Sequence, residues 1–286
     1  MTDRLYVLAF DHRRSLMTSF FGVHGEPTSD DVRAARDAKQ LIWEGLLRAL
    51  DAGVPRAAAA ALVDATYGAD VIAAAAARGI RVAVPVEESG RHELAFEHQD
   101  WRERIDRLDP TWAKVLVRYN PDADPQMNGR QRALIAELDA QCGATGRGLM
   151  LELLVPPESD HEAPDFDTVR RPELMVRAIE EIRAGDIHPS LWKVEGLDRA
   201  ADCERVARAA DAPCLVLGRG ADRAAVDAWL RAAASVPGYT GFAIGRSIWW
   251  DALRRCFDGS IAREEAASAI ASEYARCVDV YGAAAG

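Results

Sequence analysis

Three short apolar runs lie between residues 148 and 217: GLMLELL (148–154), LWKVE (191–195) and CLVL (214–217). Longer stretches with helical spacing separate them, at about 172–184 and 199–210. Strands that alternate with helices form a parallel sheet, because each helix carries the chain back to the edge where the next strand begins. The continuous apolar character of the runs predicts that this sheet is covered on both faces.

The same alternation extends in both directions along the chain. Further strands are expected at 5–10, 60–63, 81–86, 113–117 and 241–244, and further helices at about 31–52, 68–78, 128–142, 223–234, 248–257 and 263–281. Eight strand–helix units favour a closed (β/α)8 barrel, or TIM barrel, over an open sheet. We expect residues 1–286 to form one catalytic domain, with a longer excursion at 88–110 to which no role is assigned.

Composition narrows the classes of partner. The net charge of -10 disfavours nucleic acid and anionic membranes as general partners. No stretch approaches the ~18 uninterrupted apolar residues of a membrane span. The five cysteines are scattered and form no C-x-x-C pair, which is typical of a reduced, cytoplasmic protein. Self-association into a homo-oligomer stays open.

Ionisable residues stand at or near the ends of all eight expected strands. They are Asp11, Asp64, Glu87, Arg118, Glu152, Lys193, Arg219 and Arg246, and Lys114 lies slightly inside its strand. Because barrel enzymes build their active sites at the carboxyl ends of the strands, these side chains are expected to meet in a common pocket. Burial of unpaired charges would otherwise cost several kcal/mol each.

Lysine is rare in this chain, with only three among the 35 lysines and arginines. Lys39 lies in a helical pattern with charged neighbours, where a surface role is expected. Lys114 and Lys193 lie in apolar strands, where a titratable amine invites a chemical explanation that an arginine would not. A free amine attacks a ketone to form an imine. The alternative is that Lys193 is only salt-bridged, to Glu152 or Glu195.

Two carboxylates are candidates for partners of these lysines. Glu152 lies in a hydrophobic strand between the two lysine strands, where it would hold a lysine or transfer protons. Asp11 follows the first strand and could play either of these roles, although a strand-end aspartate also commonly caps a helix or turn. The sequence does not divide the acid and base roles between these two residues.

The last two strands end in glycine–arginine pairs, Gly218-Arg219-Gly220 and Gly245-Arg246. Phosphate sites recur in these barrels at the loops after strands seven and eight. Glycine lets backbone N–H groups approach an anion, and arginine binds it in a bidentate manner. These two motifs predict a phosphate site. The alternative is that both arginines pair with acidic residues at the barrel mouth.

No metal or organic cofactor is expected. Of the six histidines only His12 adjoins a strand end, and none is spaced as a zinc ligand pair. No dinucleotide fingerprint follows the first strand, and no P-loop is present.

The chain resembles the class I aldolase barrels related to tagatose-bisphosphate and sulfofructose-phosphate aldolases, and most of all the group of 2-deoxy-5-keto-gluconate 6-phosphate aldolase. The resemblance covers nearly the whole chain. It is carried by LAFDHRRSL (8–16), WAKVLVRYNPD (112–122), LMLELLVPP (149–157), LWKVEG (191–196), LGRGAD (217–222) and GFAIGRSIWWD (241–251).

This resemblance implies a Schiff-base lyase of carbohydrate metabolism, in inositol catabolism. It implies that Lys193 is the imine lysine, Lys114 the second lysine, Glu152 and Asp11 the proton-transferring carboxylates, and Gly245-Arg246 the phosphate motif. The implied reaction cleaves 2-deoxy-5-keto-gluconate 6-phosphate to dihydroxyacetone phosphate and malonate semialdehyde. The alternatives are another ketose-phosphate aldolase or isomerase, or a non-catalytic barrel that senses a phosphorylated small molecule.

Overall fold

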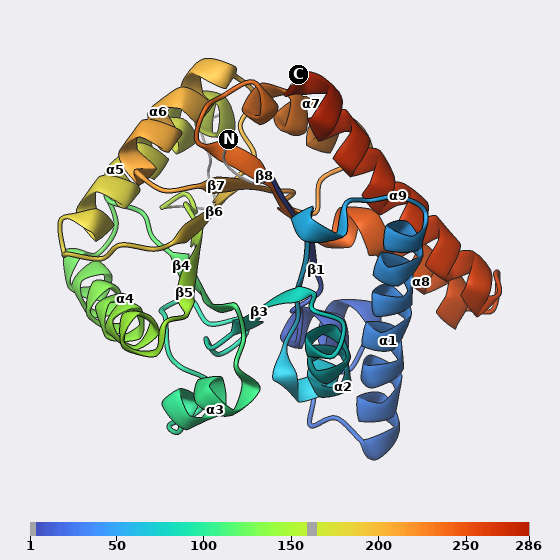
Figure 1. Ribbon diagram of the computed structural model, residues 1–286. Coiled ribbons are helices and arrows are strands. Elements are labelled where there is room, and N and C mark those ends of the chain that lie inside the picture. The colour runs from blue at the N-terminus through green and yellow to red at the C-terminus, as the bar shows by residue number, and fades with distance from the viewer. Residues whose placement is uncertain (1–3, 159–164, 286) are drawn as a thin grey trace.

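The computed structural model describes residues 4–158 and 165–285, in which eight parallel strands form a closed barrel in the order β1 to β8 (Figure 1). The predicted (β/α)8 barrel is therefore confirmed. The strands are β1 (Leu5–Ala9), β2 (Ala59–Leu62), β3 (Arg81–Pro85), β4 (Trp112–Arg118), β5 (Gly148–Leu154), β6 (Leu191–Glu195), β7 (Cys214–Leu217) and β8 (Tyr239–Ile244).

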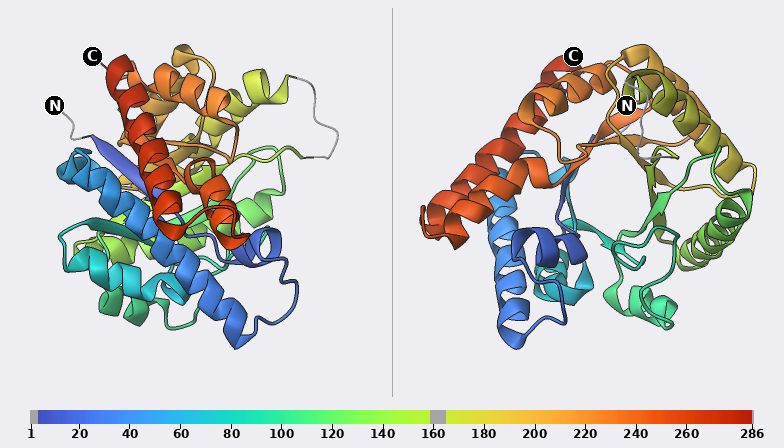
Figure 2. Two further views of the ribbon diagram at one scale, coloured as in Figure 1. Left: turned by 90° about the vertical axis from the view of Figure 1, so that its right-hand side faces the viewer. Right: turned by 180° about the vertical axis from the view of Figure 1, so that it is seen from behind.

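Helices surround the strands, as the view from behind in Figure 2 shows. They are α1 (Ser29–Asp51), α2 (Ala65–Ala76), α3 (Trp101–Leu108), α4 (Pro125–Thr145), α5 (Arg171–Arg183), α6 (Ala200–Ala210), α7 (Arg223–Ala234), α8 (Arg246–Phe257) and α9 (Arg263–Ala284). No helix in the described ranges is both long enough and apolar enough to cross a bilayer.

The excursion at 88–110 has structure of its own. Its backbone pairs with the segment just after β3 through an antiparallel bridge between Glu87 and Phe96, and it contains α3. Trp101 of α3 is buried and lies against Phe96, with ring centroids 4.6 Å apart. The excursion is therefore a packed element beside the barrel mouth.

Strand side chains alternate between two apolar layers. In β1, Leu5, Val7 and Ala9 belong to a small cluster inside the barrel, whereas Tyr6 and Leu8 belong to the larger core beneath the helices. The inner cluster also includes Met150 of β5, Leu191 of β6 and residues of other strands. Because side chains two positions apart share a face, the next inward positions toward the carboxyl ends of these strands are Asp11, Glu152 and Lys193. The apolar interior thus ends in a layer of charged side chains.

Candidate active site

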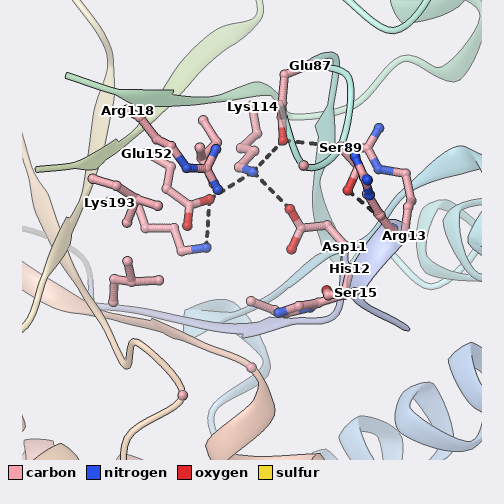
Figure 3. A pocket seen from close by; sticks show the side chains of 18 of the residues that line it. Asp11, His12, Arg13, Ser15, Glu87, Ser89, Lys114, Arg118, Glu152 and Lys193 are labelled. Atoms are coloured by element: carbon pink, nitrogen blue, oxygen red, sulfur yellow. Dashed lines mark hydrogen bonds and ion pairs between the residues drawn. The ribbon is translucent and has the colours of Figure 1, made fainter. Parts of the chain in front are cut away.

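Lys114 lies at the centre of this charged layer, at 1% exposure. Its Nζ is 2.9 Å from Asp11 Oδ2, 2.7 Å from Glu87 Oε1 and 2.8 Å from Glu152 Oε2 (Figure 3). These carboxylates come from the ends of β1, β3 and β5, so the closed barrel is what brings them to one ammonium group. A buried charge is tolerated when it is paired in this way.

Lys193 is held differently. Its side chain is 3% exposed, and the one carboxylate that pairs with it in the described structure is Glu152, at 3.0 Å from Nζ to Oε2. Glu152 and Lys193 are register partners on adjacent strands, which places both side chains on the same inner face. The same Glu152 oxygen therefore bridges the two lysines, and Lys193 has fewer counter-charges than Lys114.

Burial and charge act against each other in this cluster. Burial favours a neutral Lys114, but Asp11, Glu152 and Glu87 outweigh it and raise the pKa of the ammonium group. Burial likewise favours neutral acids, but Lys114 and Lys193 lower the pKa values of Asp11 and Glu152 below their ordinary range. Both carboxylates are therefore ionised at neutral pH, and Lys114 remains a cation.

The cluster lines a cavity of about 520 Å³ at the carboxyl ends of the strands. Figure 3 shows Asp11, Glu152 and the two lysines meeting there. The cavity also includes both glycine–arginine motifs, with Gly218, Arg219, Gly220, Gly245 and Arg246. The structure thus brings every candidate catalytic and phosphate-binding residue from the sequence to one cavity, whose volume suits a small-molecule ligand.

The two arginines of these motifs have different environments. Arg219 pairs with Asp167 at 2.9 Å and lies 3.5 Å from Glu195, as the acidic-partner alternative expects. Arg246, at the first position of α8, is exposed, and its guanidinium forms no ion pair or hydrogen bond with any described residue. Of the two, Arg246 is the one whose charge is free for a ligand.

Gly220 explains how Arg246 reaches across the loop. Its φ of +73° lies in the left-handed region, and a Cβ at this position would be 2.9 Å from Arg246 Nη2. The guanidinium therefore lies directly over the backbone of the loop after β7. The N-terminus of α8 adds positive potential at the same place.

Two expectations about individual residues are wrong. Lys39 is not on the surface: it is 1% exposed, pairs with Asp64 at 2.6 Å and donates hydrogen bonds to the carbonyls of Phe10 and His12. Asp64 does not join the cavity, because it pairs with Lys39 and caps α2 through the Tyr67 N–H. The Lys39–Asp64 pair instead fixes the backbone on both sides of Asp11.

Two further carboxylates and two arginines belong to the site or hold it in place; the sequence predicts Glu87 only as a strand-end residue and Glu195 only as a possible partner of Lys193. Glu87 contacts Lys114, and the buried Arg13 pairs with Glu87 and Glu97. Glu195 lines the cavity and is held by Arg171 at 2.7 Å. The positions of Glu87 and Glu195 at strand ends were a usable signal. Arg13 and Arg171 lie outside strands, where the sequence gives no comparable signal.

His12 is a neutral group in this charged surrounding. Burial lowers its pKa to about 3, against the opposing effect of Asp11. Its ring lies edge-on to Trp249 at 5.3 Å, and its buried Nδ1 has no hydrogen-bond partner in the described structure. The uncharged imidazole beside Asp11 is therefore available to donate a hydrogen bond to a ligand or to accept one from it.

This low pKa predicts a loss of stability in mild acid. Below pH 6.5 the unfolded chain binds a proton at His12, whereas the folded protein does not until about pH 3, so stability falls as the pH falls through this window. Between pH 6.5 and 5 we expect the free energy of unfolding to fall by roughly 1–2 kcal/mol. His12→Phe should flatten this slope in urea unfolding. An unchanged slope in the variant would assign the effect to other groups.

Comparison with known proteins adds a family and a related fold. No curated protein matches the chain. Among solved structures, Cgl0159 from Corynebacterium glutamicum (Brevibacterium flavum) is similar, with a TM-score of 0.62, 18% sequence identity and coverage of 96% of this chain and 85% of that one. At this identity the likeness shows the fold alone. The model of DUF2090, described as "Uncharacterized protein conserved in bacteria", matches residues 1–285, and the chain therefore belongs to the DUF2090 family.

Proposed function

We propose that the protein is a class I aldolase in which Lys193 forms an imine with a phosphorylated keto-sugar acid. The observation that carries this proposal is the unequal environment of two buried lysines. Lys114 is surrounded by three carboxylates and stays charged, whereas Lys193 shares a single carboxylate with it. Lys193, which no second carboxylate holds, is therefore the lysine whose amine we assign as the nucleophile.

The proposed reaction begins when the Lys193 nitrogen bonds to the ketone carbon and the ketone oxygen leaves as water. The resulting protonated imine accepts the electron pair of the carbon–carbon bond that breaks. The hydroxyl group on the departing fragment loses its proton to a carboxylate and becomes an aldehyde. The enamine left on Lys193 then takes up a proton at carbon, and water releases the ketone product.

The residues of the cluster have separate roles in this scheme. Glu152 lies 3.0 Å from the Lys193 nitrogen and is placed to take its proton. Asp11 is ionised and serves as the second carboxylate. Lys114, paired with three carboxylates, binds substrate oxygens. The substrate that the sequence resemblance favours is 2-deoxy-5-keto-gluconate 6-phosphate, with dihydroxyacetone phosphate and malonate semialdehyde as products.

Imine trapping tests the proposal directly. Incubation with dihydroxyacetone phosphate and borohydride should add irreversible mass to the protein, because reduction converts the imine to a stable secondary amine. An isomerase that works without an imine, or a phosphate-sensing barrel, would give no adduct. Absence of added mass under conditions where the ligand binds would refute the aldolase assignment.

Arg246 provides a prediction about the phosphate. Arg246→Ala should raise KM for the phosphorylated substrate, by an amount equivalent to ~1.5–3 kcal/mol, because a charge-assisted hydrogen bond is lost. Trapping of unphosphorylated dihydroxyacetone should be unaffected, which provides a control for the intact imine site. Equal effects on both compounds would remove Arg246 from phosphate binding.

A further inference from the structure

Three arginines that line the cavity have no carboxylate partner among the described residues. They are Arg14, Arg118 and Arg246. The other cavity arginines are all paired: Arg13 with Glu87 and Glu97, Arg91 with Glu88, and Arg219 with Asp167. Arg246 has been assigned to phosphate, which leaves two uncompensated cations in the same cavity.

Arg118 lies across the barrel from Arg246. It is the last residue of β4, and in a closed order of eight strands β4 is opposite β8, which Arg246 follows. Arg118 shares the inward face of β4 with Lys114, four positions earlier, and its side chain points into the cavity (Figure 3). Lys114 and Lys193 therefore lie deeper in the barrel than the two opposed arginines.

Arg14 and Arg118 each contact the short turn at residues 89–91. The Arg118 guanidinium donates a hydrogen bond of 2.7 Å to the Arg91 carbonyl. A Cβ placed on the neighbouring Gly90 would be 2.6 Å from Arg14 Cδ and 3.4 Å from Arg14 Nη1, so Arg14 lies over the glycine backbone. The Arg14 N–H also donates to Ser89 Oγ at 3.3 Å. Two cations without counter-charges in the described ranges are thus held against residues 89–91.

Both arginines line the same cavity without a carboxylate partner among the described residues, so an anionic ligand would supply the missing counter-charge. Guanidinium groups bind carboxylate and phosphate oxygens through paired N–H donors. We propose that Arg118 and Arg14 form a second anion-binding subsite, which receives a terminal carboxylate or phosphate of a ligand whose other end is a phosphate bound at Arg246. This inference rests on the proposed function only for the phosphate at Arg246, and it defines the substrate class as a chain with an anionic group at each end.

Binding of ligands without a ketone tests the subsite separately from the chemistry. Glucitol 6-phosphate has one anionic end, 6-phosphogluconate has a carboxylate at the other end, and glucitol 1,6-bisphosphate has a second phosphate there. By calorimetry, at least one two-anion ligand should bind roughly tenfold or more tightly than glucitol 6-phosphate. The tighter of the two identifies the anion that the subsite prefers.

Single arginine substitutions test which residues produce the preference for two-anion ligands. Arg118→Met and Arg14→Met should each remove most of the preference for two-anion ligands and leave affinity for glucitol 6-phosphate unchanged. Arg14→Met guards against a loosened turn, because the Arg14 guanidinium forms no hydrogen bond with the described part of the chain. Arg36→Met, an exposed arginine on α1, removes the same charge away from the cavity and should change nothing.

Equal wild-type affinity for all three ligands would overturn the subsite, as would equal weakening of all three by both variants. Borohydride trapping is a separate readout. A protein that prefers two-anion ligands but forms no imine would retain the subsite and lose the aldolase assignment. A protein that forms an imine but has no preference for two-anion ligands would retain the aldolase assignment and lose the subsite.

Discussion

Replacement of Lys193 with arginine should abolish turnover while leaving the fold intact. Arginine keeps the positive charge beside Glu152 but has no amine that can form an imine. We expect the rate to fall roughly ten-thousand-fold or more, as when other covalent nucleophiles are removed. Retention of a substantial fraction of activity would mean that Lys193 acts only through its charge.

Peptide mapping then assigns the adduct to a lysine. Cleavage at arginine separates the three lysines, because Lys193 falls in residues 184–199, Lys114 in 108–118 and Lys39 in 37–48. The reduced adduct should be found in 184–199. Lys114→Arg is the matched control, since it preserves a cation among the three carboxylates, and it should still give the adduct in that peptide. An adduct in 108–118 of the wild type would exchange the roles of the two lysines.

Lys39→Met should destabilise the fold more than replacement of any arginine at the cavity. It removes the partner of Asp64, which is 1% exposed, and the donor to the carbonyls of Phe10 and His12. Breaking a buried ion pair from one side costs about 3–5 kcal/mol. The melting temperature should fall by roughly 10 °C for a chain of this size.

A second substitution separates the charge from the packing. Lys39→Met combined with Asp64→Asn removes the unpaired carboxylate, so it should recover part of the lost stability. Comparison of urea midpoints at constant slope measures that recovery. A double variant no more stable than Lys39→Met would show that the lost hydrogen bonds to the backbone after β1 are the main cost.

The strands were predictable because each is a short apolar run with a charged residue at or near its carboxyl end. Helix starts were harder. The helix expected from 68 begins at Ala65, because the Asp64 side chain accepts a hydrogen bond from the Tyr67 N–H and so caps an earlier turn. Within 88–110, α3 ends just before Asp109, which adopts a left-handed conformation. An aspartate at this position does not by itself predict the end of a helix.

The charged cluster was predictable as a meeting of strand ends, but its pairing was not. Which carboxylate contacts which lysine depends on the closed order of the strands and on their register, and both are properties of the whole barrel. Lys39 was misjudged from its charged neighbours. Its spacing from the buried Ala35, Ile42 and Leu46 places it on the inner face of α1, and that periodicity was the better signal.

The burial of all three lysines sets how the protein responds to reagents that modify amines. At 1–3% exposure, none of these side chains presents an ammonium group to bulk solvent. Apart from the α-amino group, acylating labels and amine cross-linkers therefore find few targets on the outer surface of the folded chain. Slow amine labelling that a phosphorylated ligand prevents would report on the barrel mouth alone. Surface immobilisation of the native protein is better directed to its arginines or carboxylates.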